Sequence, residues 1–147
     1  MVVMTNKNVL LNRELVVALL RTGSRFNDEL NVLTKAYGIS LPQFNVLRIL
    51  RGQKGKPANL STLNEHMIHK MSNTTRLVDK LIDKKLVERV ICENNRRKVE
   101  ITITSKGLYL LTNIDNKLEV KEAQLVQNII PIEKEKMIDL ISKLIST

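Results

Sequence analysis

The chain has 147 residues, of which 43% are hydrophobic and 27% charged, a balance that favours a folded globular unit over a disordered chain. Few glycines and prolines interrupt it, so helix is expected to dominate. No apolar run approaches the ~20 residues needed to cross a bilayer, and the first eight residues lack an export pattern. A single cysteine, Cys92, excludes an internal disulfide framework. These features predict a cytoplasmic protein.

The formal net charge of +9 is unevenly distributed along the chain. Residues 66–98 carry nine Lys or Arg and four Asp or Glu, whereas residues 99–147 carry six and seven. A local basic excess of this kind favours binding to a polyanion such as nucleic acid. A solubilising surface is the alternative that charge alone leaves open.

The first two helices are predicted from apolar spacing and from capping residues. Apolar residues recur at three- and four-residue steps from Leu10 to Tyr37, which predicts one long amphipathic helix. Gly38 can end it, because glycine readily adopts the positive φ found just past a helix. Ser40 and Gln43 form a capping-box pattern with Pro42 in the first turn, so a second helix begins there.

A short third helix is predicted after the loop over residues 52–57. Residues 58–60 have the pattern of a brief strand. Thr62 and Glu65 match a second capping box, which predicts that the third helix opens there. Residues 68–69 would then form a tight turn.

The fourth helix pattern runs from Lys70 to Leu86, with one apolar and one polar face. A short helix, a tight turn and a second amphipathic helix are typical of a helix-turn-helix, whose second helix reads DNA. The polar face comprises Lys70, Ser72, Asn73, Arg76, Asp79, Lys80 and Asp83, with Thr75 at its boundary.

A basic β-hairpin is predicted directly after this helix. Residues 87–92 and 98–103 read as two strands, the second alternating apolar and polar residues. The predicted turn between them is Asn94, Asn95, Arg96 and Arg97. A helix-turn-helix followed by such a hairpin is the arrangement of a winged-helix DNA-binding domain.

Two more helices are expected at the carboxyl end. Thr104 is placed to cap a fifth helix, which Pro131 is expected to stop, and residues 133–145 form the last one. The first and last two helices have more apolar surface than a small winged-helix core can cover. This excess favours packing against a second copy of the chain. Closure of one monomer's core is the alternative.

Four motifs, in this order, resemble those of the MarR family of bacterial transcriptional regulators over nearly the full length. They are residues 39–47, 75–81 and 86–89, and Arg96-Arg97 followed by residues 101–107. The resemblance implies a mainly α fold with a small β-hairpin wing, forming one unit over residues 1–147. Within it, residues 38–104 would form the winged helix-turn-helix core, and residues 8–37 and 105–147 the helices of a dimerisation region.

The resemblance also implies a function. The chain would be a homodimeric repressor that binds a pseudo-palindromic DNA operator and is released by a small-molecule effector, or by oxidation, at the junction of the two regions. The family's ligand crevice would lie near the first, second and fifth helices. No cofactor is expected. One departure from the family pattern is Asn95, which stands where an Asp usually orients the arginine that reaches the groove.

Each candidate residue has an expected contact with DNA. In a major groove, Asn pairs naturally with adenine and Arg with guanine, and residues at the start of the recognition helix lie deepest. Lysines more often meet phosphates, and arginines of a wing fit the minor groove. We therefore expect Ser72, Asn73 and Arg76 to contact base edges, and Lys70 and Lys80 to contact phosphates. Arg96 and Arg97 are expected in the minor groove. Thr75 and Asn95 are the remaining candidate DNA-binding residues.

The sequence also bears on four alternative functions. No phosphate loop, dinucleotide fingerprint or nucleophile elbow is present in the sequence, so an enzyme is not expected. His66 and His69, with Glu65, are spaced to share a metal ion but lack further obvious ligands, so no metal site is expected. Cys92 could sense oxidants if nearby arginines lower the pKa of its thiol. A sequence-indifferent DNA binder would use the same basic face, although the aromatic residues used for base stacking are missing from it.

Overall fold

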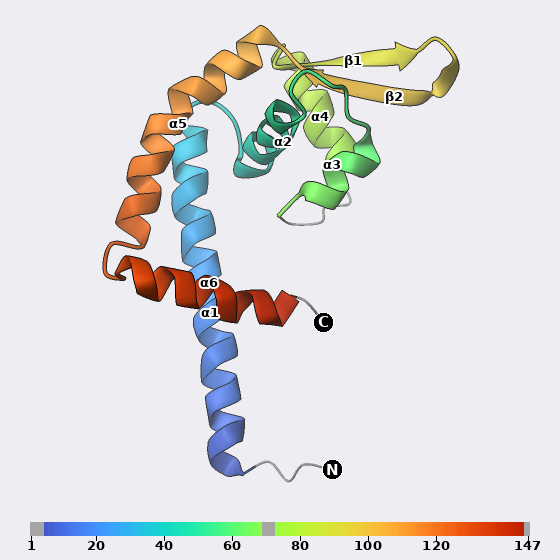
Figure 1. The fold of residues 1–147 in the computed structure, drawn as a ribbon. Helices are drawn as coiled ribbons and strands as arrows, with labels where there is room; N and C mark the ends of the chain where they lie inside the picture. Colours follow the sequence, from blue (N-terminus) through green and yellow to red (C-terminus); the bar gives the residue numbers. More distant parts are fainter. Residues whose placement is uncertain (1–4, 69–72, 146–147) are drawn as a thin grey trace.

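The computed structural model describes residues 5–68 and 73–145, without the side chains of Cys92, Arg96 and Arg97. The described chain is mainly helical, with one two-stranded antiparallel sheet (Figure 1). This agrees with the predicted fold class. In chain order the elements are α1 (Asn6–Lys35), α2 (Leu41–Gly52), α3 (Leu60–His66), α4 (Thr74–Asp83), β1 (Val87–Cys92), β2 (Asn95–Ile103), α5 (Ser105–Leu125) and α6 (Pro131–Ile145).

The long helix α1 and the capping box of α2 form as the sequence predicts. Thr5 caps α1 through its side chain, and Gly38, with φ of 80°, follows its end. The side-chain oxygen of Gln43 accepts a hydrogen bond from the Ser40 amide at 2.9 Å, and the Ser40 hydroxyl accepts one from the Gln43 amide at 3.3 Å. Pro42 lies in the first turn of α2.

The predicted capping residue of α3 was wrong. Asn59, rather than Thr62, is the N-cap, and its side-chain oxygen accepts hydrogen bonds from the Thr62 amide at 2.7 Å and the Thr62 hydroxyl at 2.9 Å. The helix therefore begins at Leu60. Of the brief strand predicted over residues 58–60, Ala58 alone pairs, and its partner is Ile101 in β2.

The predicted start and end of the fourth helix also differ from those in the structure. The described helix α4 begins at Thr74, because Asn73 has a non-helical backbone with φ of −114° and ψ of 27°. It ends at Asp83, and Lys85 adopts a left-handed φ of 60° before the chain enters β1. The candidate residues Lys70 and Ser72, with His69, lie outside the described residues.

The hairpin forms, but its turn is shorter than predicted. Cys92 is paired with Asn95, so the connection contains two residues, Glu93 and Asn94. A register irregularity between Ile91 and Cys92 accommodates this tight connection. The sequence pattern predicts Arg96 and Arg97 in the turn. In the structure their backbone belongs to β2.

The helix α5 is capped by Thr104, as predicted, but ends at Leu125, earlier than expected. Val126 has a non-helical backbone, with φ of −117°. Pro131 is the first residue of α6 rather than the residue that stops α5, since its fixed φ and missing amide proton suit the first position of a helix.

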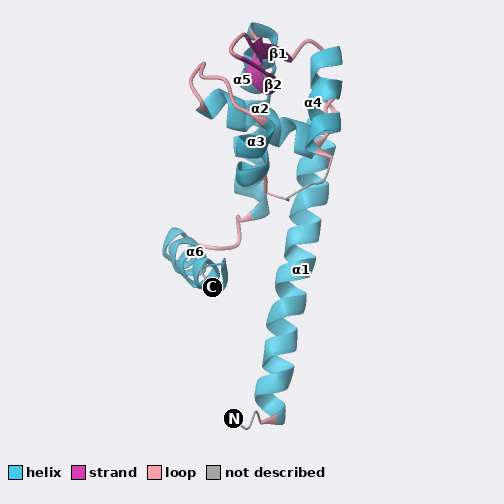
Figure 2. Cartoon of the chain, turned by 90° about the vertical axis from the view of Figure 1, so that its right-hand side faces the viewer, coloured by secondary structure: helices cyan, strands magenta, loops and turns pink. Residues whose placement is uncertain are grey.

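The core lies among α2, α3, α4, the hairpin and α5. Its fully buried side chains include Phe44, Leu47, Leu63, Leu81, Ile101 and Leu111. By contrast, α6 has no buried residue. The first half of α1 and α6 cross in Figure 1 but stand apart in Figure 2, and both extend beyond the core. Among the described residues, no helix is long and apolar enough to span a membrane.

Candidate nucleic-acid interface

The helix α4 presents a polar face away from the core. Its buried side chains Leu77, Val78 and Leu81 pack inward, because three- and four-residue spacing places them on one side. Four candidate residues are exposed on the remainder of the helix or at its start: Asn73, Thr75, Arg76 and Lys80. Within the described part of the chain, Arg76 and Lys80 form no ion pair. Both cations are therefore accessible to a ligand.

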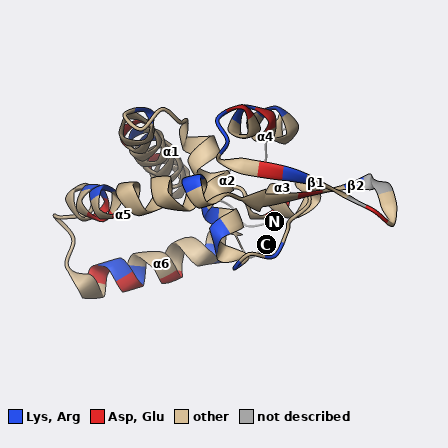
Figure 3. Ribbon diagram, turned by 90° about the horizontal axis from the view of Figure 1, so that it is seen from above, with Lys and Arg blue, Asp and Glu red and all other residues tan. Residues whose placement is uncertain are grey.

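Acidic residues on the same helix would oppose an anion unless they were paired. Asp79 is paired, since Nη2 of Arg89 in β1 lies 2.5 Å from its Oδ1. Figure 3 shows the two signs of charge on α4 and on β1. The pair neutralises one carboxylate and joins the helix to the first strand of the hairpin. It is one of the contacts between the two predicted DNA-reading elements.

The start of α4 is held against α3. The hydroxyl of the buried Thr74 donates a hydrogen bond to the side-chain oxygen of Asn64. Asn73, the residue before it, is exposed and makes no capping hydrogen bond with its side chain. Its side-chain amide is therefore available to contact a ligand, at the end of the helix that would lie deepest in a major groove.

The hairpin extends beyond the core, with Asn95 exposed at the start of β2 (Figure 1). Arg96 and Arg97 follow it in the strand. The structure thus places Asn95 and the backbone of both arginines at the outer end of the hairpin, and Asn73, Thr75, Arg76 and Lys80 on α4.

Sequence reasoning missed two contacts that position this surface. The Asn64–Thr74 and Asp79–Arg89 contacts each join residues ten positions apart on different elements. No local motif marks either one. Opposite charges at Asp79 and Arg89 were visible in the sequence, but their proximity depends on how β1 packs against α4.

A cavity of about 520 Å³ lies among α1, α2 and α5. This is where the family resemblance places a ligand crevice. Arg48 lies at this cavity with its guanidinium carbon 5.6 Å from the centre of the Phe44 ring. The lining is predominantly apolar, with Leu19, Leu20, Phe26, Leu30, Leu41, Phe44, Ile68 and Leu118, and it includes the polar Ser24, Asn27, Asn45, Arg48 and Glu122.

The structure describes only part of the two alternative sites, the histidine pair and Cys92. Nδ1 of the exposed His66 lies 2.9 Å from the Thr62 carbonyl oxygen. The described residues contain no group of three or more potential metal ligands, and His69 lies outside them. Cys92 ends β1, as predicted, and its side chain is not among those that the structure describes.

An exposed helix after a short helix, followed by an extended hairpin, defines a winged helix-turn-helix DNA-binding protein. The comparisons with known proteins agree. The family model described as the MarR family matches residues 39–99. The HTH-type transcriptional regulator MhqR of Bacillus subtilis is 30% identical over 121 residues, covering 81% of this chain and 79% of MhqR. The chain belongs to the MarR family of DNA-binding transcription regulators.

Two solved structures share the fold. A cysteine-to-serine variant of Escherichia coli MarR, complexed with operator DNA, has a TM-score of 0.79 and 20% identity, with 96% of this chain and 99% of that chain covered. Bordetella bronchiseptica BpsR, whose DNA binding is regulated by 6-hydroxynicotinic acid, has a TM-score of 0.79 and 21% identity, with 88% and 91% covered.

Proposed function

We propose that this regulator binds a pseudo-palindromic operator as a homodimer and represses transcription until a small molecule releases it. The observation that carries the proposal is the exposed polar face of α4, where Arg76 and Lys80 form no ion pair with any described residue. A sequence-specific reader needs side chains that can reach base edges, and a helix of this shape fits the major groove.

Each element has a proposed contact. Ser72, Asn73 and Arg76 read base edges, with Thr75 beside them, and Lys70 and Lys80 bind phosphates. Arg96 and Arg97, with Asn95, enter the adjacent minor groove. The MarR variant with the same fold was solved with operator DNA, which supports this mode of binding.

Exposed apolar residues at both ends of the chain support the homodimer and the domain division. A large exposed apolar surface on a protein in water marks an interaction site. We assign residues 8–37 and 105–147 to dimerisation and residues 38–104 to DNA binding. Two recognition helices related by a two-fold axis would then enter grooves about 34 Å apart. The exposed apolar residues are Val9, Leu10, Leu11, Leu15, Val16, Val17 and Leu20 of α1 and Ile132, Met137, Ile138, Leu140, Ile141, Leu144 and Ile145 of α6.

The cavity among α1, α2 and α5 is the proposed effector site. Its volume of about 520 Å³ falls within the range of about 300–1,000 Å³ typical of small-molecule sites, and its lining is mostly apolar with a few polar groups. BpsR shares the fold and is regulated by a small aromatic acid, which supports the same kind of control here.

The test of operator binding uses two duplexes of equal length. One carries the promoter region beside the chain's own gene and the other a scrambled sequence, and each is titrated by fluorescence anisotropy at two salt concentrations. Preference for the promoter duplex, lost in Arg97→Ala, would support the proposal. Equal affinities that fall steeply with salt would contradict it and indicate a sequence-indifferent binder.

Effector binding can be tested by a substitution that adds bulk at the lining of the cavity. Gly23 lines the cavity, and a Cβ atom there would meet nothing within 4 Å, so Gly23→Leu adds a large side chain at the cavity lining without a clash from its Cβ. With 6-hydroxynicotinic acid and related aromatic acids as probes, release of wild-type protein from DNA and resistance of the variant would support the site. Equal release of both proteins would place the effector elsewhere.

A further inference from the structure

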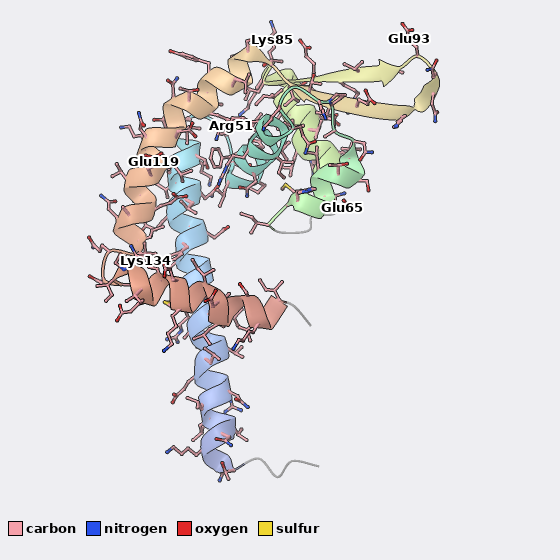
Figure 4. All side chains as sticks on the ribbon, in the orientation of Figure 1. Arg51, Glu65, Lys85, Glu93, Glu119 and Lys134 are labelled. Carbon is pink, nitrogen blue, oxygen red and sulfur yellow. The ribbon has the colours of Figure 1, made fainter. Side chains whose placement is uncertain are left out.

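The helix α2 is held at both of its ends by polar contacts to the long helices. At its start, the Leu41 amide donates a hydrogen bond to the side-chain oxygen of Asn31 in α1, at 3.1 Å. In its last turn, Arg51 binds both carboxylate oxygens of Asp115 in α5, at 2.9 and 3.2 Å. The two contacts lie about 15 Å apart along α2. Figure 4 shows Arg51 between α2 and α5.

Two polar attachment points add directional restraints to the apolar contacts of α2. The buried Phe44, Leu47 and Leu50 of α2 pack within the same core as Leu111 and Ile114 of α5. Packing of side chains between helices is compatible with crossing angles that vary by about 15–20° around a preferred value. A two-bond arginine–carboxylate pair has a fixed planar geometry, so it selects one arrangement among those that the core permits.

The Arg51–Asp115 pair is well placed to orient the DNA-binding core. The helix α2 contacts α3, α4 and β2, whereas α5 continues away from the core (Figure 1). Both side chains are little more than one-third exposed, so the pair is not expected to dominate stability. Its directional geometry instead restricts rotation of α2 against α5. Because α2 contacts α4, such a rotation would move α4 and the polar face that it carries.

We propose that Arg51 and Asp115 are positioning residues that fix the angle between the winged core and the long helices, and thereby the separation of the two recognition helices on an operator. The second half of this inference rests on the proposed homodimer. The first half concerns a single chain and is tested without DNA.

Asp115→Asn tests the proposal, and Glu29→Gln is its matched control. Glu29 pairs with Lys121 at 3.0 Å, joining α1 to the same helix α5 without involving the core. Each variant raises the net charge of +9 by one unit. Added positive charge strengthens binding to DNA, so weaker binding of Asp115→Asn would report geometry and not charge.

The first measurement is a distance distribution within one chain. Spin labels are placed at the exposed Asp83 of α4 and Glu119 of α5, in full-length protein with Cys92→Ser, diluted with unlabelled protein. We expect Asp115→Asn to widen or shift the distribution and Glu29→Gln to leave it unchanged. An unchanged distribution in Asp115→Asn, or equal changes in the two variants, would overturn the proposal whether or not the protein binds an operator.

The second measurement uses operators whose half-sites are one base pair closer or farther apart. We expect Asp115→Asn to lose about tenfold in affinity for the native spacing, because each dimer contains the pair twice, and to discriminate less among spacings. Its affinity for scrambled DNA should not fall. Wild-type discrimination retained in Asp115→Asn would overturn the role in spacing. Failure of the wild type to prefer any operator would overturn the proposed function and this role in spacing, while the single-chain measurement still decides the angle.

Discussion

Replacing Gly107 by alanine should destabilise the protein, although alanine usually stabilises a helix. Gly107 is buried in the first turn of α5, and a Cβ atom there would lie 2.7 Å from Cγ1 of Ile103 and closer still to the Leu86 carbonyl oxygen. That oxygen accepts a hydrogen bond from the Thr104 amide at 3.0 Å, so the backbone cannot move away without weakening this contact.

The expected magnitude follows from opposing effects. Alanine gains about 1 kcal/mol over glycine in a helix interior. Overpacking against backbone costs about 1–3 kcal/mol, and a weakened buried hydrogen bond about 1 kcal/mol more. We expect Gly107→Ala to lower the free energy of unfolding by about 2 kcal/mol in urea titrations at fixed protein concentration, since association would make stability concentration-dependent.

The control is Gly23→Ala in α1. Nothing lies within 4 Å of a Cβ atom at Gly23, so the helix preference of about 1 kcal/mol should be realised and stability should rise. The opposite signs at the two glycines are the prediction. A Gly107→Ala variant as stable as wild type would contradict this prediction, because it would mean that α5 is not closely packed against Leu86 and Ile103.

Three further predictions concern single side chains. Lys85 has a φ of 60°, so Lys85→Gly should raise the free energy of unfolding by about 1 kcal/mol in the same titration, and a loss of stability would contradict this. Ser40→Ala removes half of a capping box and should cost about 1 kcal/mol, whereas no change would mean that the cap is dispensable. Arg76→Ala should reduce discrimination between operator and scrambled DNA by about 1–3 kcal/mol. Lys80→Ala should instead lower the affinity for both duplexes alike and reduce the slope of affinity against salt concentration by about one. The reverse pattern would exchange the roles of the two residues.

The order of elements was predictable because local signals are strong in this chain. The capping box of Ser40 and Gln43, the cap at Thr104 and the apolar face of α4 each depend on residues within one or two helical turns. Such signals act before any tertiary contact forms. They identified the winged helix-turn-helix and placed Arg76 and Lys80 on its exposed face.

Two of the errors, at the start of α3 and at the hairpin turn, depend on pairing between distant parts of the chain. Asn59 and Thr62 can each cap a helix, and Ala58, the residue before Asn59, pairs with Ile101, so that Asn59 becomes the N-cap and α3 begins at Leu60. At the hairpin, four polar residues suggested a four-residue turn, whereas pairing of Cys92 with Asn95 shortened it to two. Tertiary pairing decided both cases.

The contacts that orient the candidate interface could not be predicted. Arg51 and Asp115 are 64 positions apart, and Arg89 and Asp79 belong to different elements. Many acidic and basic residues could have paired in a chain with this much charge. The lining of the cavity likewise depends on how α1, α2 and α5 pack, although the family resemblance indicated its location.

The most direct test of the proposed operator binding is selection of bound sequences from a library of random duplex DNA, at physiological salt, followed by sequencing. The account predicts enrichment of an inverted repeat whose half-sites are centred about one helical turn apart, with lower enrichment for Arg76→Ala. Recovery of DNA without a shared sequence would contradict it, because the basic surface would then bind phosphates alone.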